Sequence, residues 1–216
     1  VIDCARKLGA GTGGAAFLVN SGNANAFTGK AGDDSVTAIC RAVAEASGVP
    51  AARVFTASTG VIGERLPHDR ITRAVERLVA EARPDGLAAA AHAIMTTDTF
   101  PKAAVRMAET AQGPVTIAGI AKGSGMIAPD MATMLAFLYT DASVGFDLLQ
   151  RCTADMAAST FNRITVDGDT STSDTVLVAA TGASGIDVEA LDAAGRAAFE
   201  RALHDVMADL ARQIVC

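Results

Sequence analysis

One threonine in the sequence stands where a self-activated nucleophile could form. Thr133 follows the small residue Ala132, and residues 123–130 before it read GSGMIAPD. Gly and Pro at such positions allow the backbone to bend sharply. Attack of the Thr133 hydroxyl on the Ala132 carbonyl would break the amide bond, give an ester and free the amine of Thr133, and water would then cleave the ester. The freed α-amino group, with a reference pKa of ~7.7–8.0, could serve as the base for that hydroxyl. A threonine ahead of an apolar strand is also an ordinary β-former, so the residues alone leave both interpretations open.

Other nucleophiles and phosphate loops find little support in the sequence. The three histidines, His68, His92 and His204, all lie in helical patterns, and no GxSxG segment is present. We expect His68 and His204 to be solvated, and His92 to lie near the core. No GxxxxGK[ST] segment occurs, and the glycines of residues 9–14 precede a strand instead of opening a helix after one. A Ser-His-Asp triad and a nucleotide-binding loop are therefore both disfavoured.

Four loops share one composition, in which glycine is mixed with Ser, Thr, Asn or Lys after a short apolar run. They are residues 20–29, 58–63, 122–126 and 167–175. Backbone N–H groups in glycine-rich loops can hold an anion or a developing oxyanion. Ordinary turn chemistry explains any single loop equally well. Four such loops together favour a polar site built at the ends of strands.

The composition restricts the class of protein. Of 216 residues, 50% are hydrophobic, 4% are aromatic and none is Trp, so the core must be built from small aliphatic side chains, as in layered α/β proteins. A net charge of −6 and the absence of any basic run argue against nucleic acid as a partner. No run approaches the ~20 apolar residues of a membrane span, and no signal peptide opens the chain. We therefore expect a cytoplasmic protein with no membrane partner.

The four cysteines are widely spaced and show no zinc-binding pattern, so no metal site is expected. Cys40 and Cys152 lie on the apolar faces of helical patterns, where free thiols pack as small hydrophobes. We expect them to be buried structural thiols.

Hydrophobic periodicity predicts the elements that would position these loops. We expect strands at residues 15–20, 53–57, 103–107, 115–121, 134–139 and 176–180, and helices at 67–82, 146–161 and 188–215, the last with a possible break near Gly195. A further helix would be capped by Asp33 or Asp34 and would end at Gly48. Strands and helices do not alternate strictly, and residues 103–121 resemble a hairpin. The fold class predicted is therefore α/β (α+β), with helices layered on largely antiparallel or mixed sheets.

Five segments together resemble one known family. They are residues 20–29 (NSGNANAFTG), 58–63 (STGVIG), 95–99 (MTTDT), 122–135 (KGSGMIAPDMATML) and 164–172 (ITVDGDTST). In type and order they are similar to the motifs of the bifunctional glutamate/ornithine N-acetyltransferases of arginine biosynthesis, over residues 15–181. The resemblance implies a layered architecture of the N-terminal-nucleophile kind.

The resemblance also implies a reaction. The precursor would cut itself between Ala132 and Thr133 into α and β chains that stay together, in an α2β2 heterotetramer. N2-acetyl-L-ornithine would acetylate Thr133 and release ornithine, and the acetyl group would pass to L-glutamate. No cofactor is implied, although acetyl-CoA serves as a donor in bifunctional members.

Roles for other residues follow by motif position. Thr59 and Gly60 would form the oxyanion hole, while Thr99, Lys122 and Thr133 would contact the substrate. For Asp167, Asp169 and Asp174, a part in the site and ordinary turn formation remain equally open.

The resemblance further implies that residues 1–216 are one partial catalytic domain and an internal piece of a longer protein. Residues 1–132 would be the C-terminal part of the α chain, and residues 133–216 the N-terminal part of the β chain. Because the remaining substrate ligands would lie beyond Cys216, we expect this piece alone to be inactive. Two alternatives remain: an N-terminal-nucleophile amidase or aminopeptidase that gives the acyl group to water, and a non-catalytic metabolite-binding domain.

Overall fold

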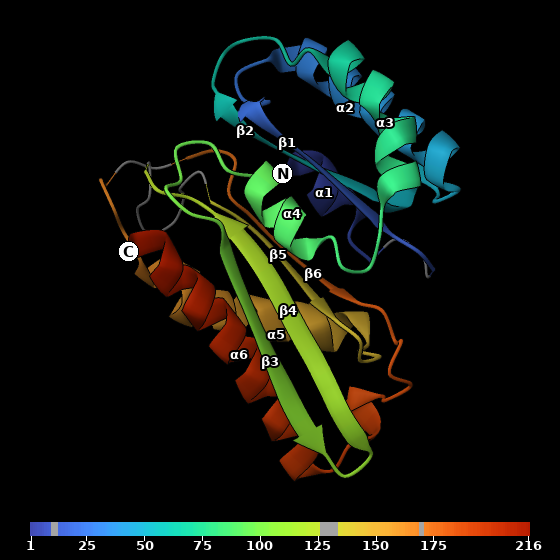
Figure 1. The fold of residues 1–216 in the computed structure, drawn as a ribbon, viewed down its shortest axis with the longest axis vertical. Helices are drawn as coiled ribbons and strands as arrows, with labels where there is room; N and C mark the ends of the chain where they lie inside the picture. The colour runs from blue at the N-terminus through green and yellow to red at the C-terminus, as the bar shows by residue number, and fades with distance from the viewer. Residues whose placement is uncertain (10–12, 126–133, 169–170) are drawn as a thin grey trace. The chain divides into compact units, whose positions relative to one another are not determined.

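The structure is a computed structural model that describes residues 1–9, 13–125, 134–168 and 171–216 (Figure 1). The chain forms two compact units, Val1–Thr96 and Thr97–Cys216, and each is described by itself. The predicted cut between Ala132 and Thr133 falls outside the described residues. The assignment of residues 1–132 and 133–216 to two chains therefore stays a prediction.

The first unit is a pair of parallel strands covered by helices. Its elements are α1 (Ile2–Lys7), β1 (Ala16–Asn23), α2 (Gly29–Ser47), the 3-10 turn η1 (Ala51–Arg53), β2 (Val54–Val61), α3 (His68–Glu81) and α4 (Leu87–Ala93). β1 and β2 pair in parallel from Ala16↔Val54 to Asn23↔Val61. α2 and α3 lie side by side in Figure 1, and their apolar faces join β2 in one buried cluster. Ile39 of α2, Val54 of β2 and Val75 of α3 are all at most 2% exposed in this cluster.

Two boundaries in this unit differ from the prediction. Both strands run on into segments predicted as loops, because the pairing of β1 with β2 continues through Gly22↔Gly60 to Asn23↔Val61. α2 begins at Gly29, so Asp33 and Asp34 lie inside the helix and do not cap it. The predicted end is confirmed: Gly48 adopts φ +73° and its N–H donates to the carbonyl of Ala44.

The second unit is a four-stranded mixed sheet in the order β3-β4-β5-β6. Its elements are β3 (Lys102–Thr110), β4 (Gly113–Lys122), β5 (Leu135–Thr140), α5 (Phe146–Ser159), the 3-10 turns η2 (Phe161–Arg163) and η3 (Val188–Ala190), β6 (Thr175–Ala180) and α6 (Ala193–Val215). β3 pairs with β4 and β4 pairs with β5 in antiparallel fashion, whereas β6 runs parallel to β5. The predicted α/β class with helices on mixed sheets is confirmed.

The core of this unit lies between the sheet and helices α5 and α6. Gly119 of β4 allows α6 to approach closely, since a Cβ built there would lie 3.0 Å from both Leu138 Cγ and Leu210 Cδ1. The helical range predicted at residues 188–215 is divided: η3 ends at Ala190 and α6 begins at Ala193, so the interruption lies just before Gly195 and α6 continues through that residue. The Gly195 N–H donates to the Asp192 carboxylate at 2.7 Å and closes the first turn of the helix.

The cysteine prediction is confirmed, since Cys40 and Cys152 are buried and all four thiols are free. Across the helices that the structure describes, none is long and apolar enough to cross a membrane. Among the described residues, no group of three or more His, Cys, Asp and Glu side chains could hold a metal ion.

Candidate active site

The polar groups of the first unit gather where β1 and β2 end. Thr59 is 0% exposed, and Gly60 beside it has φ +125°. A Cβ at Gly60 would lie 2.3 Å from the backbone carbon of Gly22 on the neighbouring strand, a distance that no side chain tolerates. Glycine at this position therefore lets the two strand ends come into close contact and sets the direction of the Thr59–Gly60 backbone.

Side chains bridge the same strand ends. The Ser58 hydroxyl donates to the Asn20 side-chain oxygen at 2.6 Å, and the Asn20 amide donates to the carbonyl of Asn23 at 2.8 Å. Since Asn20 and Ser58 are also register partners, the bridge fixes β2 one residue before Thr59. A rigid backbone is what an oxyanion hole requires, because preorganised donors need not reorient as charge develops.

In the second unit, Lys122 is the last residue of β4 and is only 3% exposed. It pairs with Leu135, two residues after Thr133 in the chain. Burial lowers the pKa of the Lys122 ammonium, and Lys102 adds to this effect, whereas the carboxylates of Asp98 and Asp174 oppose it. A buried ammonium beside carboxylates is a suitable partner for a carboxylate ligand.

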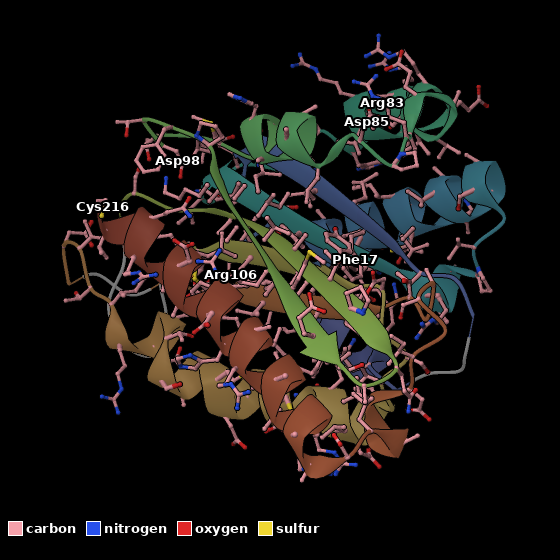
Figure 2. The ribbon with its side chains drawn as sticks, turned by 60° about the horizontal axis from the view of Figure 1, so that its bottom comes forward. Phe17, Arg83, Asp85, Asp98, Arg106 and Cys216 are labelled. Carbon is pink, nitrogen blue, oxygen red and sulfur yellow. The ribbon has the colours of Figure 1, made fainter. Side chains whose placement is uncertain are left out.

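Asp98 fixes the loop that follows Lys122. One oxygen of its buried carboxylate accepts both from the Lys102 ammonium at 2.8 Å and from the Gly123 N–H at 2.7 Å. The side chains of Asp98 and Lys102 are 0% and 2% exposed, and the Lys102 ammonium also lies 4.5 Å from the centre of the Phe100 ring. Figure 2 labels Asp98 near the start of β3. Asp98 therefore joins the start of β3 to the end of β4 at Lys122.

Asp174 fixes the start of β5. Its carboxylate accepts from the Met134 N–H at 2.7 Å, while the N–H of Thr175 donates to the Met134 carbonyl at 3.0 Å. Burial raises the pKa of Asp174 to about 7, against the opposing effects of the Met134 N–H, the Lys122 ammonium and the Ser171 side chain. Both backbone groups of the residue after Thr133 are thus held by β6 and the residue before it.

The remaining predicted residues have different surroundings. Thr99 is exposed in the segment between α4 and β3, and nearby the Thr97 and Ser124 hydroxyls lie 2.8 Å apart. Ala132 and Thr133 lie outside the described residues, as does Asp169. Asp167 is exposed.

The histidines lie in helices as the sequence predicted. His68 Nδ1 is 2.9 Å from the Ser35 hydroxyl, and His204 is partly exposed on α6. The expected place of His92 near the core is wrong, because its side chain is exposed on α4.

The structure thus places Thr99 and Lys122 in the second unit and Thr59 and Gly60 in the first. Sequence reasoning missed the buried pair of Asp98 and Lys102, although Asp98 lies inside the motif at residues 95–99. Its spacing of four residues from Lys102 spans Pro101, so no helical pattern marked the two as partners.

These features define an α/β protein in which strand ends carry a buried lysine, two anchoring carboxylates and a glycine-dependent close backbone approach. The sequence pattern of the ArgJ family matches residues 1–216, the whole chain. This chain therefore belongs to the ArgJ family.

Several known proteins are similar to the chain. It is 57% identical over 216 residues to the arginine biosynthesis bifunctional protein ArgJ of Ruegeria pomeroyi, covering 100% of this chain and 52% of that protein. The protein of the same description from Nitrobacter winogradskyi is 50% identical over 205 residues, which cover 93% of this chain and 49% of that protein. The chain thus spans about half the length of these curated relatives.

Among solved structures, ornithine acetyltransferase from Mycobacterium tuberculosis, crystallised with ornithine, is 41% identical, with a TM-score of 0.49. That match covers 53% of this chain and 61% of that chain.

Proposed function

We propose that the protein to which this chain belongs transfers an acetyl group from N2-acetyl-L-ornithine to L-glutamate. The reaction passes through an ester on Thr133, which becomes the first residue of a β chain after autoproteolysis behind Ala132. Membership in the ArgJ family supports this proposal, as do the relatives described as arginine biosynthesis bifunctional proteins.

One observation carries the proposal furthest. Lys122 is a buried cation at the end of β4, paired with the strand that starts two residues after the proposed nucleophile. Both proposed substrates are amino acids with a carboxylate, and a buried ammonium can bind this group through charge-assisted hydrogen bonds. The cation thus provides a reason for a carboxylate-bearing substrate beside Thr133.

Each chemical step has a group suited to it. The Thr133 hydroxyl attacks the acetyl carbonyl, the bond from that carbon to the ornithine nitrogen breaks, and ornithine leaves as the free amine. The glutamate amine then attacks the ester, and the Thr133 hydroxyl is restored. The α-amino group of Thr133 accepts and returns the proton in both steps. Thr59 and Gly60 bind the oxyanion, where one donor is typically worth about 2.7–4 kcal/mol of barrier.

The proposal includes further features that rest on the family resemblance. Thr99 contacts the substrate, acetyl-CoA serves as a second donor, and no cofactor takes part. Two α and two β chains assemble, and the protein works in the cytoplasm.

Acetyl transfer tests the proposal directly. The full-length gene product would be incubated with N2-acetylornithine carrying a labelled acetyl group, with and without glutamate. We expect label in N-acetylglutamate from the unaltered protein, and none from a Thr133→Ala variant. Thr37→Ala, on the exposed surface of α2, is the matched control and should behave as the unaltered protein.

Two other results would identify a different class of protein. Label released as acetate, with or without glutamate, would instead identify an amidase. No acetyl transfer and no acylation would identify a non-catalytic binding domain.

A further inference from the structure

Asp174 has two interactions that have no role in the proposed reaction steps. Its carboxylate lies at the start of β6, where it accepts from the Met134 N–H at 2.7 Å. It is also one of the two carboxylates whose charge acts on the buried Lys122 ammonium. One side chain thus touches the strand that begins after Thr133 and acts on the cation at the end of β4.

We propose that Asp174 is a positioning residue with two separable effects: its oxygen holds the backbone of Met134, and its negative charge keeps Lys122 protonated to receive a substrate carboxylate. The second effect, as far as it concerns substrate, rests on the proposed function.

The first effect follows from the geometry of the strand ends. The Met134 N–H donates to the Asp174 carboxylate, and the Met134 carbonyl accepts from the N–H of Thr175. The side chain of Ser171, itself 3% exposed, binds the Asp174 carboxylate in turn. The backbone of Met134 is thereby held against the start of β6.

The second effect follows from charge and burial. Among the described residues, the charged groups that act on Lys122 are Asp98, Lys102 and Asp174. Asp98 raises the Lys122 pKa more than Lys102 lowers it, and Asp174 raises it further. Asp98 is also bound to the Lys102 ammonium at 2.8 Å. Without Asp174, Asp98 would be the remaining carboxylate, among the described residues, that opposes the lowering of the Lys122 pKa by burial and Lys102.

The two effects also differ in their dependence on pH. Because burial raises the pKa of Asp174 to about 7, its charge acts on Lys122 mainly above neutral pH. The hydrogen bond to the Met134 N–H needs only an oxygen acceptor and persists in both protonation states. An asparagine at position 174 keeps such an acceptor and lacks the charge, whereas an alanine lacks both.

The variants Asp174→Asn and Asp174→Ala in the full-length protein separate these effects, and Asp141→Asn is the matched control. Asp141 also accepts a backbone N–H, that of Thr116 at 2.8 Å, but it lies at the other end of the sheet. The Lys122 pKa would be measured by NMR of protein labelled with ¹³C at lysine Cε, with the signal assigned through Lys122→Met. The KM for N2-acetylornithine and the kcat would be measured from pH 6 to pH 9.

We expect Asp174→Asn to lower the Lys122 pKa, because the variant removes one of the two carboxylates whose charge raises it. Its KM should match that of the unaltered protein near pH 6 and rise up to about tenfold above it on the alkaline side, with kcat nearly unchanged. Asp174→Ala should also lower kcat at every pH. Asp141→Asn should leave the Lys122 pKa and both kinetic constants unchanged.

Three results would overturn the proposal. An unchanged Lys122 pKa in Asp174→Asn would remove the charge effect, and equal kcat values for Asp174→Asn and Asp174→Ala would remove the anchoring effect. An equal shift in Asp141→Asn would show a general response to lost carboxylates. A lowered Lys122 pKa in a protein that transfers no acetyl group would retain the electrostatic role and refute only the proposed function.

Discussion

Replacing Gly60 by alanine tests the close approach of the two strands that carry the proposed oxyanion hole. Gly60 has φ +125°, a backbone conformation that side chains rarely adopt, and such strain costs about 1–3 kcal/mol. The new Cβ would in addition lie 2.3 Å from the backbone carbon of Gly22 and 2.6 Å from the nitrogen of Asn23. Backbone atoms cannot rotate away as a side chain can, so the strand ends must separate.

The cross-strand partner of Gly60 provides a matched control. Gly22 also has a positive φ, +105°, but a Cβ built there meets no heavy atom within 4 Å. Gly22→Ala should therefore cost only the conformational strain of about 1–3 kcal/mol, whereas Gly60→Ala should exceed it by about 1–3 kcal/mol of overpacking. The difference between the two variants isolates the close contact from the strain.

The assay is urea unfolding followed by far-ultraviolet circular dichroism, on the unaltered protein and both variants. The free energies of unfolding should rank unaltered protein, Gly22→Ala and Gly60→Ala, from most to least stable. Acetylation of Thr133 should be slowest in Gly60→Ala, because the backbone of Thr59 moves with the separated strand. Equal stability of the two variants would refute the close-approach reasoning.

Three further predictions concern the second unit. Lys102→Met should cost about 3–5 kcal/mol in urea unfolding, because the buried Asp98 carboxylate loses its cation; a loss below 1 kcal/mol would contradict this. Gly119→Ala should lower the free energy of unfolding by about 1–3 kcal/mol, because the new Cβ overpacks against Leu210. In the double variant with Leu210→Ala, part of that loss should be recovered. Purely additive losses would contradict the overpacking. Between pH 3.8 and about 7, Asp174 is protonated in the folded chain but ionised in the unfolded chain. The free energy of unfolding should therefore fall as the pH rises through this range. The fall is at most roughly 4 kcal/mol, and Asp174→Asn should lack it when urea unfolding is compared at pH 5 and pH 8.

Local signals in the sequence were enough to predict most of the elements. The helix ending at Gly48 is an example, since a glycine after an apolar helical pattern is needed for the left-handed φ of +73° seen there. The hairpin of β3 and β4 was predicted from neighbouring strand patterns at residues 103–107 and 115–121, and these strands pair from Lys102↔Ala121 to Thr110↔Gly113.

Errors arose where pairing between distant segments overrides local composition. Residues 58–61 have the composition of a loop, yet they continue β2 because β1 provides a partner as far as Asn23↔Val61. No pattern within residues 58–61 contains this information.

The same distinction applies to the site. Thr59, Gly60, Thr99 and Lys122 could be named as candidates because they stand in continuous motifs. The bond between Asp98 and Gly123 joins residues 25 positions apart, and the one between Asp174 and Met134 joins residues 40 apart. Such contacts depend on the order of strands in the sheet, which the sequence did not determine.

The mass of the intact full-length protein, before and after incubation with N2-acetylornithine, reports both the cut behind Ala132 and the acetylation of Thr133. We expect two polypeptides, one ending at Ala132 and one beginning at Thr133, and an acetyl group on the second after incubation. A single uncut polypeptide that gains no acetyl group would contradict this expectation.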